Sequence, residues 1–161
     1  MGKLLELIAY QVTKHEQHKE KRHNELLIAE DENDNKWVII EGCAAFRVRG
    51  PWIFDTEKLI ANIGQYNVCK SINSLIKGYE GEEVTYYGTT VNDGKEVAVF
   101  RELDVDRKYV MNMQYWKLLQ KLFKELPFEG RLYYSTSKCM FLWEVNDEPN
   151  GFILGIRGVI K

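Results

Sequence analysis

The chain has 161 residues, of which 45% are hydrophobic, and its formal net charge is -2. This length suits one compact domain with a core of its own, and the charge predicts neither a strongly basic nucleic-acid binder nor a self-repelling acidic chain. A local basic face remains compatible with this composition. Three widely spaced cysteines, Cys43, Cys69 and Cys139, indicate neither a disulfide framework nor a paired zinc motif, and we expect them to be reduced.

The N-terminal segment predicts a helix over residues 3–14, because Leu4, Ile8 and Val12 recur at a spacing of four. The charged run that follows, residues 14–23, has no apolar anchor and should lie in solvent. No apolar signal core and no run of membrane-spanning length is present in the sequence. We therefore expect a cytoplasmic protein without a membrane partner.

Residues 26–42 place acidic and amide residues between two apolar runs, which fits either a calcium loop or a hairpin turn. Asp31, Asn33 and Asn35 alternate as in an EF-hand loop. However, Lys36 stands where the calcium loop needs glycine, and Gly42 where it needs a bidentate glutamate. Strand-forming residues flank the turn, so the pattern favours a hairpin, with a third strand over residues 44–50.

The middle of the chain predicts two helices, over residues 57–63 and 68–78, the second ending at Gly78. Two strands should follow, over residues 82–88 and 95–103. The connection between them contains Asn92, Asp93 and Gly94, which are typical of a hairpin turn.

The best helical pattern covers residues 110–126, and Pro127 stops it. The apolar stripe of this helix consists of Met111, Tyr115, Leu118, Leu119, Leu122 and Leu126. Three strands are predicted after it, over residues 131–137, 138–145 and 151–159, with residues 146–151 as a loop.

A helix followed by a strand meander therefore occurs at both ends of the chain. We predict an α+β fold that repeats this unit, with an antiparallel sheet, helices on one face and a central helical insertion. The first half-unit covers residues 1–50, the insertion and hairpin residues 51–104, and the second half-unit residues 105–161.

Catalytic and metal motifs are incomplete. His15 and His18 form a zinc-protease-like HEQH that is one residue short, and neither it nor the nearby His23 provides an evident third ligand. Ser74 and Lys77 match the start of an acyl-enzyme motif whose partner motifs do not occur. We expect no enzyme, no metal and no cofactor.

Basic residues gather in two places. On the face of the last helix opposite the apolar stripe, Lys117, Lys121 and Lys124 form a row. The second group follows the first helix and contains Lys14, Lys19, Lys21 and Arg22. Such rows can contact phosphates nonspecifically, and they are also ordinary solubilising surface, so both interpretations stay open.

The order of elements resembles the DNA sliding clamps, the family of the bacterial polymerase III beta subunit. Residues 3–50 resemble the opening of a clamp half-domain, with Arg22 in a basic loop, Glu41 and Gly42 where many clamps have Asp-Gly, and Arg47 near their following arginine. Residues 105–123 resemble the second helix with its lead-in, and residues 132–158 resemble the closing strands, which end near Arg157.

The resemblance implies helices lining a central hole, a ring of several domains, and a role in DNA replication. The seven basic residues named above would then approach the phosphates of double-stranded DNA. Our leading hypothesis is a non-enzymatic, clamp-like processivity or DNA-associated scaffold factor that forms homo-oligomers. The alternative is a protein-interaction or regulatory module of viral or mobile-element origin, in which a sheet edge or apolar groove captures a partner peptide.

Overall fold

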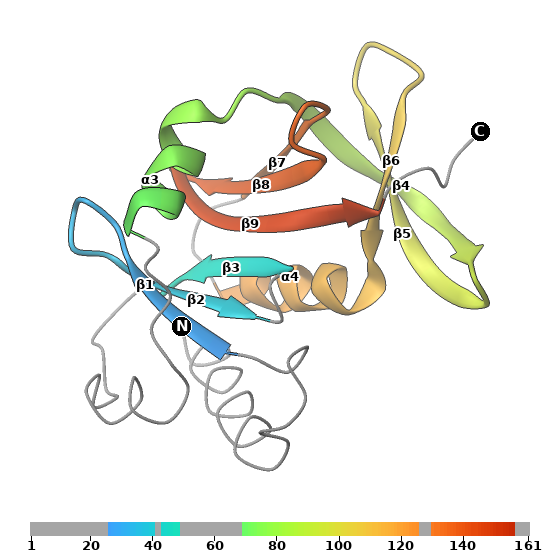
Figure 1. The fold of residues 1–161 in the computed structure, drawn as a ribbon. Coiled ribbons are helices and arrows are strands. Elements are labelled where there is room, and N and C mark those ends of the chain that lie inside the picture. Colours follow the sequence, from blue (N-terminus) through green and yellow to red (C-terminus); the bar gives the residue numbers. More distant parts are fainter. Residues whose placement is uncertain (1–25, 41–42, 49–68, 126–129, 157–161) are drawn as a thin grey trace. The chain divides into compact units, whose positions relative to one another are not determined.

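The computed structural model describes residues 26–40, 43–48, 69–125 and 130–156 (Figure 1). The chain divides into two compact units, Met1–Tyr79 and Glu80–Lys161. In the described residues of both units, antiparallel strands predominate and only two helices occur. The predicted helices over residues 3–14 and 57–63 lie outside the described residues, and the predicted boundaries at residues 50 and 104 stay predictions.

The first unit is built on the hairpin that the sequence predicts. β1 (Leu26–Glu30) pairs antiparallel with β2 (Lys36–Ile40), and β2 pairs with β3 (Ala44–Arg47). Trp37, Val38 and Phe46 are buried, as expected for strands rich in aromatic and β-branched side chains. The hairpin and the third strand are confirmed.

Helix α3 (Cys69–Gly78) is anchored to the turn of this hairpin. The backbone N–H of Glu32 donates a 3.0 Å hydrogen bond to Oδ1 of Asn73, and Nζ of Lys77 lies 2.7 Å from Oε1 of Glu32. Ile72 of α3 is buried. The helix predicted over residues 68–78 is confirmed as α3, and Lys77 near its end forms an exposed ion pair with Glu32.

The second unit consists of two three-stranded meanders joined by two seams. Within each meander, successive strands pair antiparallel; the first strands of the two meanders pair as β4 with β7, and the last strands pair as β6 with β9. These pairings close the six strands into a ring. The strands are β4 (Glu82–Asn92), β5 (Lys95–Glu102), β6 (Lys108–Asn112), β7 (Arg131–Ser135), β8 (Met140–Val145) and β9 (Glu148–Ile156).

Two tight turns set the register of this unit. Asp93 and Gly94, between β4 and β5, and Asn146 and Asp147, between β8 and β9, all have positive φ. Positive φ at both central residues is typical of the two-residue turns whose twist matches that of paired strands. The residues predicted as a loop after position 145 are therefore a two-residue turn, and β9 already begins at Glu148.

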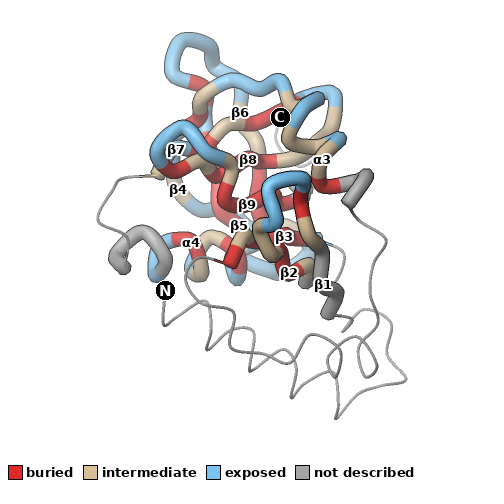
Figure 2. The backbone as a smooth tube through the Cα atoms, turned by 90° about the vertical axis from the view of Figure 1, so that its left-hand side faces the viewer, coloured by how far each residue is buried: buried red, intermediate tan, exposed pale blue. Residues whose placement is uncertain are grey.

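The core of the second unit is aromatic. Phe100 of β5 contacts Phe141 of β8 at 5.2 Å and Trp116 of helix α4 (Met113–Glu125) at 5.0 Å between ring centroids. Helix α4 follows directly from β6 and packs against β5 and β6, with Tyr115 and Leu119 buried. Figure 2 shows buried positions along β5, β8 and β9 and exposed turns between strands.

The predicted clamp-like α+β architecture is wrong. The described part of the chain is mainly antiparallel sheet with two short helices, and no layer of helices covers one sheet face. The error has a local origin: residues 110–112 continue the apolar pattern of the following helix but belong to β6, and residues 89–92 extend β4. Residues 82–112 thus form a meander of three strands, β4 to β6, and both of its outer strands pair with the second meander. The sequence pattern predicts only two strands in this region, as part of an insertion.

Neither helix in the part of the chain that the structure describes is both long enough and apolar enough to cross a membrane.

Candidate nucleic-acid interface

A β-bulge in β4 displays Tyr87 on the surface of the second unit. Tyr86 pairs with Phe100 of β5, but the next paired residue of β4 is Gly88, which faces Val99. Tyr87 is therefore the extra residue of the bulge, without a partner across β5. A bulge changes the direction in which a side chain leaves its strand. The Tyr87 side chain is 55% exposed.

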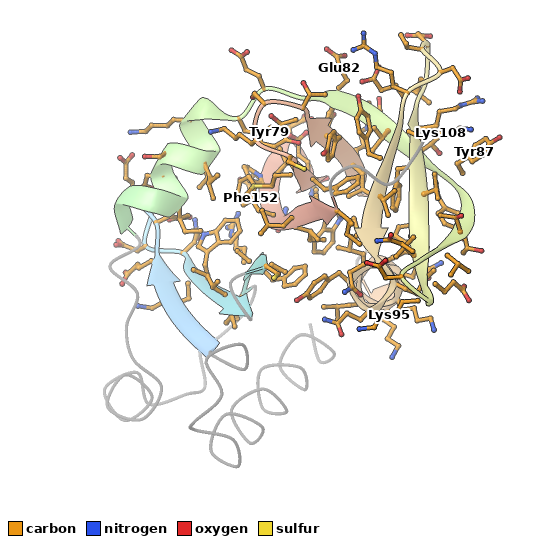
Figure 3. The ribbon with its side chains drawn as sticks, turned by 45° about the vertical axis from the view of Figure 1, so that its right-hand side comes forward. Tyr79, Glu82, Tyr87, Lys95, Lys108 and Phe152 are labelled. Carbon is orange, nitrogen blue, oxygen red and sulfur yellow. The ribbon has the colours of Figure 1, made fainter. Side chains whose placement is uncertain are left out.

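Two cations lie against the Tyr87 ring. Cζ of Arg101 is 5.4 Å and Nζ of Lys108 is 4.6 Å from the ring centroid. Arg101 and Lys108 are cross-strand partners of β5 and β6, and Arg101 also faces Thr85 of β4. Figure 3 shows Tyr87 and Lys108 side by side at the outer edge of the unit. We call Tyr87, Arg101 and Lys108 the bulge cluster.

Strand β4, which carries the bulge, contacts helix α4 through a stacked aromatic pair next to the bulge. The ring of Tyr86 stacks on Trp116 with centroids 5.0 Å apart and planes at 25°. Tyr86 precedes the bulge residue, and Trp116 precedes Lys117 of the predicted basic row. The strand that carries the bulge and the helix that carries the lysines are thus neighbours within one unit.

The sequence-predicted basic residues are only partly placed. Lys117 and Lys121 are exposed on α4, as their position opposite the apolar stripe predicts. Lys124 belongs to α4, but its side chain is outside the described residues. The other group, Lys14, Lys19, Lys21 and Arg22, also lies outside the described residues, as do His15, His18 and His23. Contact of these basic residues with DNA stays a prediction.

A pocket of about 530 Å³ opens beside the connection between β5 and β6. Leu103 and Val105 in this connection are exposed. Glu102, one of the lining residues, is only 6% exposed, and one of its carboxylate oxygens accepts a 2.6 Å hydrogen bond from the hydroxyl of Tyr109. The pocket is lined by Glu82, Glu83, Glu102, Leu103, Asp104, Val105 and Arg107.

The buried Glu102 carboxylate changes the acidity of Tyr109. Burial, together with the hydrogen bond to Glu102 and the negative charge of that residue, raises the pKa of Tyr109 to about 12. The neutral hydroxyl is thereby favoured, so Tyr109 serves as a hydrogen-bond donor rather than as a base at ordinary pH.

The acidic turn of residues 31–35 is a hydrogen-bonded turn. The carboxylate of Asp31 accepts bonds of 2.9–3.0 Å from the backbone N–H of Asn33 and of Asn35, the Asn35 side-chain amide and the Trp37 indole. Burial alone would raise the pKa of Asp31, but these donors outweigh it and lower the pKa below 3.8. Among the described residues, no group of three or more His, Cys, Asp or Glu side chains could hold a metal ion.

The bulge cluster was not predicted from the sequence. Tyr87 and Arg101 fall within predicted strands, but nothing in strand alternation indicates that Tyr87 leaves the pattern. Gly88 was the available signal, because a glycine inside a strand often marks a bulge. The predicted strand ends at Gly88, whereas β4 continues through the bulge to Asn92.

Comparisons of the chain with protein-family models, with curated proteins and with solved structures found no match. Membership of the sliding-clamp family therefore stays a prediction.

Proposed function

We propose that the chain is a non-enzymatic nucleic-acid-binding protein that holds the phosphate backbone on the outer face of its second unit. The observation that carries this proposal is the bulge cluster, in which Arg101 and Lys108 flank an exposed tyrosine. Cationic side chains on an exposed strand surface attract phosphates without reading base sequence. The exposed Lys117 and Lys121 of the adjoining α4 add positive charge to the same unit.

This proposal keeps the DNA association that we predicted and drops the ring-forming processivity role, which depended on the clamp architecture. A cytoplasmic location is part of the proposal.

The test is binding of labelled duplex and single-stranded oligonucleotides, measured by fluorescence anisotropy between about 50 and 200 mM salt. The double charge reversal Arg101→Glu with Lys108→Glu should weaken binding at least tenfold at the lower salt, and lower the salt slope by about one for each lost contact. The matched control is Lys95→Glu with Lys138→Glu. It changes the net charge equally, and Lys95 lies at the far end of the β4–β5 hairpin, away from the cluster (Figure 3).

The control should bind nearly as well as the wild type. Equal losses in both double variants would mean that net charge, and not the bulge cluster, governs binding. No binding of any oligonucleotide by the wild type at low salt would contradict the proposal.

The second candidate function is protein interaction, which the exposed Leu103 and Val105 beside the pocket favour. Exposed apolar side chains next to a pocket are typical of surfaces that contact another protein. Light scattering over a range of concentrations tests self-association of this surface. A mass that rises with concentration in the wild type and stays constant in Leu103→Ser with Val105→Ser would support it.

A further inference from the structure

We infer that Tyr87 stacks against an unpaired base, so that the second unit prefers single-stranded nucleic acid over duplex. This inference rests on the proposed function and names the form of nucleic acid that the bulge cluster takes. The reason for the inference is the position of the ring. Cations alone would attract phosphates, so an exposed aromatic side chain beside them indicates a second kind of contact.

The β4 bulge separates Tyr87 from the aromatic core. Its neighbour Tyr86 packs on Phe100 and Trp116, with ring centroids at 5.8 and 5.0 Å. Tyr87 contacts no aromatic ring in the described part of the chain and is 55% exposed. The core thus uses Tyr86, whereas Tyr87 contacts the two cations and keeps more than half of its surface exposed.

The surroundings of Tyr87 fit a nucleotide better than an isolated apolar group. The ring offers a flat surface for a base, while Arg101 and Lys108, within 5.4 Å of its centroid, offer positive charge for the adjoining phosphates. Aromatic platforms next to cations are the common way in which proteins hold single strands without sequence preference. In a duplex the base faces are stacked on each other, so only the phosphate contacts would remain.

The cross-strand arrangement fixes the backbone positions of the three residues of the cluster. Arg101 and Lys108 face each other on β5 and β6, and Tyr87 lies over both from β4. All three positions belong to one meander that is joined by backbone hydrogen bonds. A base would therefore meet a preformed platform, and the shared chemistry admits either DNA or RNA single strands.

The experiment uses the full chain and three labelled probes of about 12 nucleotides, within the range of single-strand site sizes. These are an oligothymidylate, a strand of the same length with abasic residues throughout, and a duplex. The abasic strand keeps the phosphates and removes the bases. An oligouridylate of the same length distinguishes RNA from DNA.

The variants are Tyr87→Ala and Tyr87→Phe, compared with the wild type. Tyr87→Ala should weaken oligothymidylate binding about tenfold and leave abasic-strand and duplex binding unchanged, because only stacking is removed. Tyr87→Phe keeps the ring and should bind like the wild type. Far-ultraviolet circular dichroism and thermal unfolding show whether both variants fold, as expected for an exposed bulge residue.

Equal effects of Tyr87→Ala on all probes, or no effect on any, would overturn the stacking inference. If the Arg101 and Lys108 charge reversal still weakens binding in that case, the proposed function stands and only the single-strand preference fails. If the wild type binds none of the probes, both fail.

Discussion

Gly155 of β9 and the ring of Tyr134 approach each other so closely that a Cβ at position 155 would lie 3.0 Å from Cε2 of the tyrosine. The same Cβ would lie 3.3 Å from the carbonyl oxygen of Cys139. That carbonyl accepts a 2.9 Å hydrogen bond from the backbone N–H of Gly155. A side chain at this position would therefore require Tyr134 or the Cys139 backbone to shift by a few tenths of an ångström.

Gly155→Ala should lower the free energy of unfolding by about 1–3 kcal/mol, because the added methyl group overpacks a site bounded by backbone and a buried ring. Urea unfolding, followed by tryptophan fluorescence, measures the change. Leu154→Ala is the control on the same strand, since Leu154 is 39% exposed and should matter less. A larger loss for Leu154→Ala than for Gly155→Ala would contradict the close approach.

Stability should fall at alkaline pH because of Tyr109. Its pKa is raised to about 12 in the folded state, from 10.0, so the neutral hydroxyl is favoured by folding. The stabilisation is fully present below pH 10 and is lost as the pH rises from 10 to about 12. Urea unfolding at several pH values in this range should therefore show a smaller alkaline loss for Tyr109→Phe than for the wild type.

Two further variants test the cause of that pKa. Glu102→Gln removes the negative charge beside the hydroxyl and should lower the pKa of Tyr109, observed as earlier tyrosinate absorption on titration. Tyr133→Phe is the control for the loss of a tyrosine from β7, a strand that does not pair with β6. An alkaline unfolding profile that is the same in all variants would exclude the Tyr109–Glu102 pair as its source.

Asp31 should make the first unit sensitive to acid. Burial raises its pKa, but the hydrogen bonds from Trp37, Asn35 and Asn33 lower it below 3.8, so folding favours the ionised carboxylate. The stabilisation is present above pH 3.8 and is lost as the pH falls through the folded-state pKa. Asp31→Ala should cost about 1–3 kcal/mol at neutral pH and flatten the acid dependence of urea unfolding.

A double-variant cycle with Trp37→Phe isolates the most buried of these contacts, the 3.0 Å bond from the indole Nε1. The losses should be less than additive, because both single variants remove the same bond. Full additivity would show that Asp31 acts only through the turn backbone.

The turn between β8 and β9 should tolerate glycine and reject a β-branched residue. Asp147 has a φ of 61°, a conformation that is costly for side chains branched at Cβ. Asp147→Val should therefore destabilise by about 1–2 kcal/mol, whereas Asp147→Gly should be neutral or slightly stabilising. Thermal unfolding of both variants checks this difference, and equal melting temperatures would contradict the assigned turn.

The basic row of α4 should assist nucleic-acid binding without selecting the single strand. Lys117→Glu with Lys121→Glu should weaken duplex and single-strand binding alike, and lower the salt slope by about one per lost phosphate contact. Anisotropy titrations over several salt concentrations measure both quantities. Unchanged affinity would leave these lysines as solubilising surface.

Local patterns in the sequence were sufficient for several individual strands and for α3, but not for the architecture. The hairpin of residues 26–40 follows from two apolar runs around Asp31 and Asn33, and α3 follows from its periodicity and its end at Gly78. β6 was missed because Val110 and Met111 continue the apolar stripe of the helix that begins at Met113. An apolar run of two or three residues is too short for its periodicity to distinguish a strand from the first turn of a helix.

The ring and the bulge cluster were beyond such patterns. The two seams pair Val84 with Leu132 and Val110 with Ile156, residues that are far apart along the chain. The bulge cluster depends on the register between β4 and β5, because one residue more or less would place Tyr87 opposite a partner. Arg101 and Lys108 become neighbours of that ring only when all three strands have formed.

The two seams also determine the order in which the second unit can fold. The hairpins within each meander join residues close along the chain and can form early, whereas each seam requires the closure of a long loop. The turns should therefore already be native in the transition state, and the seam contacts should form after it. Substitutions at Ile156 or Leu132 would then mainly accelerate unfolding, and those at Gly94 would mainly slow folding.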